Sequence, residues 1–182
     1  GTCATSVGRE PSDLPYHGDK WAHLMTGNTF PCDSKIESWE YYIDDNSLTS
    51  AYLTTWRPVA KSRFTLISST RVVATRPGNH SVILTQQIDV KQGDFIGIHY
   101  EHKAKGGIIP FSRGNDDVVP DNQLFDTVIL PRDDSDFHVG NTIDLSGWST
   151  IKATFAVIAR LEGYGKPIPT PAPTGSPPPI NK

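Results

Sequence analysis

The sequence predicts an all-β protein, an antiparallel β-sandwich of jelly-roll type with a Pro-rich C-terminal tail. Three observations lead to this prediction. Apolar and polar residues alternate in several short segments, turn-forming residues separate these segments, and β-branched residues are frequent within them. Of the 182 residues, 36% are hydrophobic and 20% are charged, so the chain can bury a core of its own.

The alternation places most of the strands directly. The segment 35–43 has Trp39, Tyr41 and Ile43 on one face and Ile36 on the other. A second strand at 52–56 is expected to stop at Pro58, because proline cannot donate a hydrogen bond to a neighbouring strand. Further strands are expected at 63–68, 81–85 and 95–101.

The clearest signal lies near the C-terminal end, in Ile151–Leu161. Every second residue of this run is apolar, which predicts one long central strand. Its apolar face comprises Ile151, Ala153, Phe155, Val157, Ala159 and Leu161. Turn signals at Arg76–Asn79 and Gln92–Asp94 separate earlier strands, so no helices are expected in this region.

Composition divides the chain into three zones. Residues 1–26 show little periodicity and predict an irregular leader, whereas residues 27–163 carry the strands. Residues 164–182 are rich in Pro and Thr and predict an extended linker. A linker of this kind favours a further domain beyond it, and a plain disordered tail is the alternative.

The two cysteines are expected to form a disulfide between Cys3 and Cys32, which would tie the leader to the sandwich. Two free thiols are the alternative. The triplet Asn79-His80-Ser81 between two predicted strands is an acceptor for N-glycosylation at Asn79. Both features favour an extracellular location.

Bulk properties argue against several classes of protein. The net charge of −3 is unlike the basic surface of a nucleic-acid binder. No apolar run reaches the roughly 20 residues of a membrane-spanning helix, so no membrane insertion by this segment is expected. The chain starts at Gly1 instead of Met, which favours a processed or excised segment.

No catalytic motif stands out, and we expect no enzyme activity. His99 and His102 are spaced like metal ligands, but on a strand they would face opposite sides, so two surface histidines are expected. Arg57 lies on a strand between Trp56 and Pro58, where it can pair with a carboxylate below the sheet. We favour this structural role over a ligand-binding one.

Two acidic loops are candidates for calcium, which prefers several carboxylate and carbonyl oxygens. The six candidate ligands are Asp116, Asp117, Asp121, Asp133, Asp134 and Asp136. Loop aspartates are more often turn formers, and this is the alternative. The two loops would form a single joint site if they meet at one end of the sandwich.

Tryptophans offer a second kind of site, because an exposed indole can stack on a sugar ring. Trp39 shares a face with apolar residues and is expected in the core. Trp56, at a strand end, could cap the core or face solvent, and Trp148 lies in a turn expected before the last strand. Trp56 and Trp148 are therefore the candidate residues for carbohydrate binding.

Five segments in this order resemble a β-sandwich module of large extracellular mosaic proteins of animals. They are SWEYYI at 38–43, LTTWRP at 53–58, RFTLISSTRVV at 63–73, IDVKQGDFIGIHY at 88–100 and GGIIPF at 106–111. The resemblance implies an adhesive, matrix or receptor-ectodomain role without catalytic residues. We therefore expect a non-catalytic interaction or structural module with extracellular proteins or glycans as partners. A calcium-assisted, lectin-like domain is the alternative.

Overall fold

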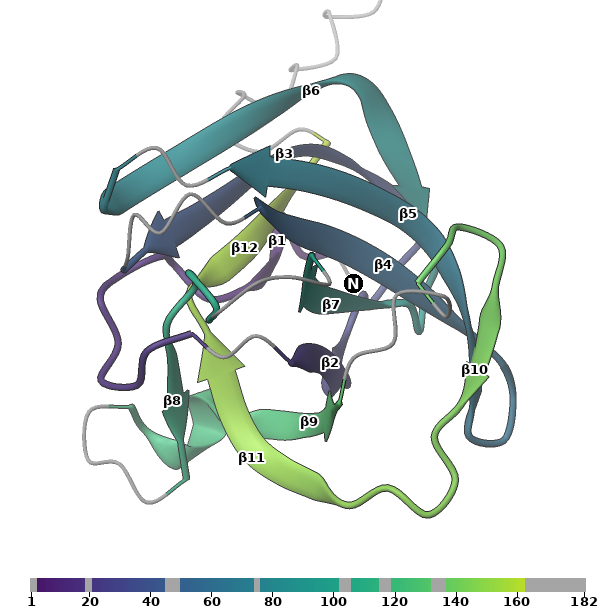
Figure 1. The fold of residues 1–182 in the computed structure, drawn as a ribbon. Coiled ribbons are helices and arrows are strands. Elements are labelled where there is room, and N and C mark those ends of the chain that lie inside the picture. Colours follow the sequence, from purple (N-terminus) through teal and green to yellow (C-terminus); the bar gives the residue numbers. More distant parts are fainter. Residues whose placement is uncertain are drawn as a thin grey trace, which may run out of the picture.

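Two antiparallel β-sheets pack face to face in the computed structural model (Figure 1), which confirms the predicted all-β sandwich. The structure describes residues 3–18, 21–44, 50–73, 76–101, 106–114, 119–131 and 137–162. The predicted linker at 164–182 lies outside these ranges. Within them, no helix is long and apolar enough to span a membrane.

The first sheet has four strands, which are, in spatial order, β1 (Ser6–Gly8), β12 (Val157–Leu161), β3 (Ser34–Ile43) and β6 (Gly78–Val90). The second has eight, in the order β10 (Thr142–Asp144), β5 (Arg63–Val73), β4 (Ser50–Ala60), β7 (Phe95–Tyr100), β2 (Ala22–Thr29), β9 (Phe125–Leu130), β11 (Thr150–Phe155) and β8 (Phe111–Arg113). A short 3-10 turn, η1 (Asp121–Gln123), precedes β9.

The strand order is that of a jelly roll. When β1 to β7 and β12 are numbered one to eight along the chain, the first sheet contains them in the order 1-8-3-6 and the second in the order 5-4-7-2. The chain therefore passes repeatedly from one sheet to the other, as jelly-roll sandwiches do. The strands β8 to β11 come between the last two of these eight and extend the second sheet at both edges.

The run Ile151–Leu161 is not one strand, and this prediction is wrong. It divides at Ala156 into β11 in the second sheet and β12 in the first. Ala156 is fully buried and forms backbone hydrogen bonds with Pro110 and Tyr42, so the chain turns a corner between the sheets there. The predicted apolar face is nevertheless correct, because its residues from Ala153 to Leu161 all join the main core.

Pro58 does not end its strand, contrary to the prediction. Strand β4 continues to Ala60, and Pro58 is paired with Phe64 of β5. The other neighbour, β7, pairs with β4 only as far as Trp56. Pro58 therefore lies where its strand has a partner on one side only, so its missing N–H costs no hydrogen bond in the sheet.

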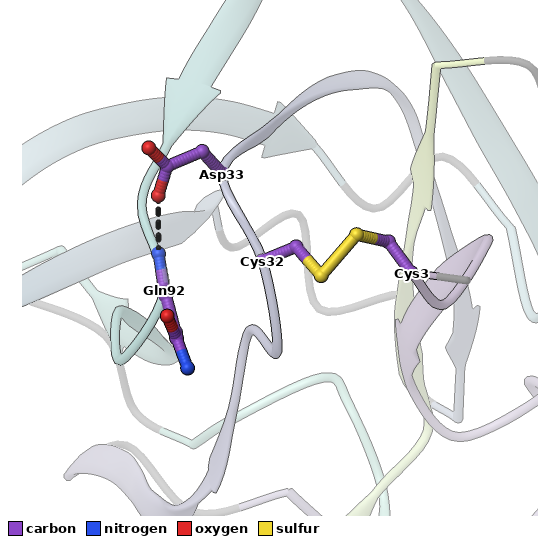
Figure 2. The surroundings of a disulfide bond; sticks show 4 residues. All are labelled: Cys3, Cys32, Asp33 and Gln92. Atoms are coloured by element: carbon purple, nitrogen blue, oxygen red, sulfur yellow. Dashed lines mark hydrogen bonds between the residues drawn. A yellow bond between two sulfur atoms is a disulfide. The ribbon is translucent and has the colours of Figure 1, made fainter. Parts of the chain in front are cut away.

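The leader belongs to the sandwich. Cys3 and Cys32 form the predicted disulfide, with an S–S distance of 2.10 Å (Figure 2). Strand β1 pairs with β12, and β2 lies inside the second sheet between β7 and β9. The predicted boundary at residue 26 is therefore wrong, because it cuts through β2.

The second sheet has a core on each face. The main core lies between the sheets and includes Trp39, Ile98 and Tyr100. A smaller core on the opposite face joins Trp56 and Phe95 to apolar residues of the segment 137–145. Gly97 is required here, since a methyl group in its place would lie 2.6 Å from the Nε1 atom of Trp56.

Candidate functional site

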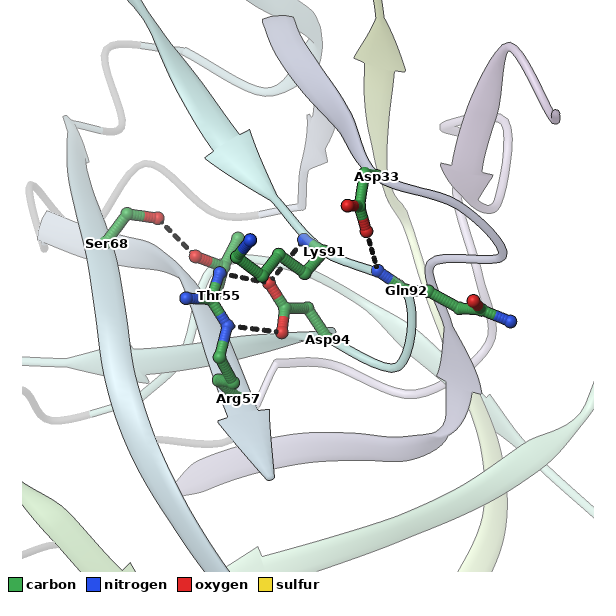
Figure 3. A network of polar contacts seen from close by, with 7 residues as sticks. All are labelled: Asp33, Thr55, Arg57, Ser68, Lys91, Gln92 and Asp94. Atoms are coloured by element: carbon green, nitrogen blue, oxygen red, sulfur yellow. Dashed lines mark hydrogen bonds and ion pairs between the residues drawn. The ribbon is translucent and has the colours of Figure 1, made fainter. Parts of the chain in front are cut away.

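Arg57 pairs with a carboxylate, as predicted, and this carboxylate is Asp94 in the turn before β7 (Figure 3). The Nε and Nη2 atoms of Arg57 donate to the two oxygens of Asp94 at 3.0 and 2.9 Å. Asp94 is 1% exposed and also accepts the backbone N–H of Lys91 at 2.8 Å. The pair joins a turn to a strand, which is a structural role.

Trp56 is not a surface ligand site, and this prediction is wrong. Its side chain is fully buried in the smaller core, and its Nε1 donates to the Thr54 hydroxyl at 3.0 Å. Trp39 is buried as expected. Trp148 lies in a turn before β11 and is 46% exposed, so it remains a candidate for stacking on a ligand.

A column of stacked rings lies at the outer face of the second sheet, next to the smaller core. The ring of His99 lies between those of Tyr52 and Phe137, with centroid distances of 4.8 and 4.7 Å. Trp56 meets Phe137 edge-on at 5.9 Å. His99 is buried, so the prediction of a surface histidine is wrong for it, and His102 lies outside the described residues.

Two hollows share Phe137 in their walls, and we call them together the Phe137 groove. The first has a volume of about 350 Å³ and is lined by Tyr52, Ser69, His99, Tyr100, Glu101, Phe137 and His138. The second has a volume of about 290 Å³ and is lined by Leu130, Pro131, Phe137, Thr142, Ile143, Asp144, Leu145 and Trp148.

The groove combines aromatic surface with a polar rim. Glu101 accepts two hydrogen bonds from Arg71 at 3.4 Å, and both side chains are about half exposed. Asp144 accepts the backbone N–H of Ser146 at 2.8 Å, and this bond lowers the pKa of its carboxyl group. The carboxylate therefore stays ionised close to the Trp148 indole. Rings together with fixed polar groups are typical of sites for small polar ligands.

The calcium prediction stays open. Five of its aspartates, Asp116, Asp117, Asp133, Asp134 and Asp136, lie outside the described residues. Asp121 is exposed in η1. Among the described residues, no group of three His, Cys, Asp or Glu side chains could hold a metal ion.

Asn79 lies at the start of β6, the edge strand of the first sheet, and its side chain is exposed. Ser81, the third residue of the acceptor triplet, is exposed on the same face of the strand. The fold therefore leaves room for a glycan at Asn79, and its attachment remains a prediction.

Sequence reasoning missed His23, a histidine in the main core. Its ring contacts those of Phe155 and Phe111 at centroid distances of 4.7 and 5.9 Å. Neither ring nitrogen has a hydrogen-bond partner in the described part of the chain. Burial lowers the pKa of His23 to about 3, so it is neutral in the folded protein. The signal available in the sequence was its place between apolar residues of β2.

His23 should make the fold sensitive to acid. The unfolded chain takes up a proton near pH 6.5 and the folded chain does not, so stability falls as the pH drops from about 6.5 towards 3. We expect the free energy of unfolding to be about 2 kcal/mol lower at pH 5 than at pH 7.5 from this residue. Urea unfolding of wild type and His23→Leu at both pH values measures the difference. His17→Gln, which changes an exposed histidine, should keep the wild-type dependence.

If His23→Leu loses as much stability on acidification as the wild type does, the proton taken up on unfolding does not belong to His23.

Comparisons of the chain with protein families, with curated proteins and with solved structures found no match. The assignment of function therefore depends on the chemistry of the site alone.

Proposed function

We propose that this chain is an extracellular, non-catalytic interaction module that binds its partner through the Phe137 groove. The disulfide supports an oxidising compartment, because such bonds seldom persist in the cytosol. The observation that carries the proposal is Trp148, a large indole left nearly half exposed at the edge of a hollow. Aromatic anchors beside a polar rim are typical of binding surfaces.

A carbohydrate ligand is the second candidate. A sugar presents a C–H face that packs on an aromatic ring and hydroxyl groups that bond to carboxylates. In the second hollow, Trp148 supplies the ring, and Asp144 and Thr142 supply a carboxylate and a hydroxyl. Glu101, Ser69 and His138 supply similar groups in the first hollow. A protein partner would use the same rings as anchors.

Replacing Trp148 with alanine should weaken binding of the labelled domain to animal cell surfaces by about tenfold or more, the loss typical of a central aromatic anchor. Trp21→Ala is the matched control, because Trp21 is 42% exposed and lines neither hollow. It should bind like the wild type. Both variants should keep the wild-type melting temperature. Equal binding by Trp148→Ala and wild type would contradict the proposal, because Trp148 is the anchor that carries it.

A glycan array separates the two candidate functions. Binding to defined glycans that is lost in Trp148→Ala and kept in Trp21→Ala identifies a carbohydrate ligand. Cell-surface binding together with a blank array assigns the groove to a protein partner instead.

A further inference from the structure

We propose that a second cleft, between the leader and β9, binds a small molecule that carries a carboxylate or a sulfate group. The residues 8–12 of the leader form one wall, Gln123 and Phe125 form the other, and Thr154 of β11 completes the lining. The volume is about 560 Å³, within the roughly 300–1,000 Å³ of small-molecule sites. The cleft shares no lining residue with the Phe137 groove, so the proposal does not depend on the proposed function.

An ion cluster fixes the leader wall of this cleft. Arg160 of β12 has a side chain that is 6% exposed, and it donates to both oxygens of Glu10 at 2.6 and 2.7 Å. It also donates to both oxygens of Glu40 at 2.7 and 3.0 Å. The hydrogen bonds between Arg160 and Glu10 lower the pKa of the Glu10 carboxyl group. Both oxygens of the Glu10 carboxylate are thus bound by Arg160, whereas the neighbouring Arg9 bonds to Gln123.

Arg9 has an unused donor edge. Its Nη1 atom donates to the side-chain oxygen of Gln123 at 2.7 Å, which holds the guanidinium between the two walls. Its Nε atom is buried and has no hydrogen-bond partner among the described residues. A buried N–H without a partner costs free energy and calls for an explanation. The Nε and Nη2 atoms form the edge of the guanidinium that binds a carboxylate or a sulfate with two parallel hydrogen bonds.

The region behind Thr154 contains a second buried polar atom without a partner. The hydroxyl oxygen of Ser112 in β8 is buried and has no hydrogen-bond partner in the described ranges. Ser112 is directly opposite Thr154 in the β8–β11 pairing, so the two side chains lie next to each other on one face of the sheet. Thr154 lines the cleft, and the Ser112 hydroxyl is fully buried beside it.

These groups define the chemistry of the ligand. The Arg9 guanidinium bonds to no carboxylate among the described residues, so it can bind a negatively charged group, and its fork geometry matches the oxygen pair of a carboxylate or a sulfate. The ring of Phe125 and Pro11 offer apolar surface to the rest of the molecule. A neutral ligand could offer the Arg9 edge only uncharged acceptors, which form weaker hydrogen bonds than a carboxylate or a sulfate.

Calorimetric titration at millimolar concentrations tests the proposal with three probes: glucuronate, glucose 6-sulfate and glucose. At least one of the two anionic sugars should bind the wild type, and glucose should not. Arg9→Lys keeps the charge and removes the Nε donor and the fork, so affinity should fall by about tenfold. Arg113→Lys is the matched control, because Arg113 lies over the ring of Tyr16 in a different cavity, and it should bind within twofold of the wild type.

Binding of glucuronate alone identifies a carboxylate site, and binding of glucose 6-sulfate alone identifies a sulfate site. The proposal is overturned if neither anion binds, if glucose binds equally well, or if Arg9→Lys binds like the wild type. If Arg9→Lys melts well below the wild type, Gln123→Ala replaces it. This variant frees the guanidinium from its Nη1 acceptor and should weaken binding severalfold, and unchanged affinity would contradict the proposal.

Discussion

Replacing Asp94 with alanine should lower the free energy of unfolding by about 3 to 5 kcal/mol. The substitution removes both acceptors of the Arg57 guanidinium, whose side chain is only 27% exposed, and leaves this charge without its partner. It also removes the acceptor for the Lys91 N–H, which closes the turn into β7. The guanidinium of Arg57 stays charged in the variant, because an arginine does not release its proton at neutral pH, so the charge loses its partner without being neutralised.

Urea unfolding of Asp94→Ala at neutral pH measures this loss. Asp33→Ala is the matched control, because Asp33 also accepts a backbone N–H, that of Gln92 at 2.9 Å, but at an exposed position (Figure 3). We expect it to cost about 1 kcal/mol or less. The double variant Arg57→Ala, Asp94→Ala should lose less than the two single losses combined. A loss below about 1 kcal/mol for Asp94→Ala would show that water replaces the pair in full.

Replacing Cys3 and Cys32 together with serine should lower the free energy of unfolding by about 3 to 4 kcal/mol. The disulfide closes a loop with a sequence separation of 29 residues, and it restricts the unfolded chain more than the folded one. Chemical denaturation of the double variant gives the loss. Wild type unfolded in the presence of a reductant is the control and should show the same midpoint as the variant.

A variant as stable as the oxidised wild type would contradict this prediction, because it would mean that the disulfide does not restrict the unfolded chain.

Sequence patterns predicted the strands better than their arrangement. The alternation in Ile151–Leu161 predicted the correct apolar face. It did not predict the bend at Ala156, because apolar residues recur at every second position on both sides of the bend. The burial of Trp56 depends on Phe137 and Leu145, which cross the outer face of the sheet some 80 to 90 residues later. The alternation of apolar residues within one strand cannot show that a distant segment covers the outer face of that strand.

The same limit applies to the candidate sites. The Arg57–Asp94 pair could be predicted in part, since an Arg on a strand next to Trp and Pro suggested a carboxylate below the sheet. The clefts could not. Arg9 meets Gln123 across 114 positions, and Arg160 meets Glu10 across 150. The order of the strands in the sheets decides which distant polar residues come together. The spacing of residues in the sequence does not reveal this order.

The disulfide also determines how the domain would carry a mechanical load. Strand β1 is antiparallel to β12, with Ser6 opposite Arg160, so a pull between residues 3 and 162 would unzip this edge pair one bond at a time. With the disulfide closed, tension passes from Cys3 directly to Cys32 and then to Lys35, whose carbonyl accepts the N–H of Glu162 at 2.8 Å. When the disulfide is formed, the force therefore acts on the pairing of β3 with β12 instead of the pairing of β1 with β12. The force then does not pass through residues 4–31. In a string of domains, the redox state of one bond would then set which strands separate first.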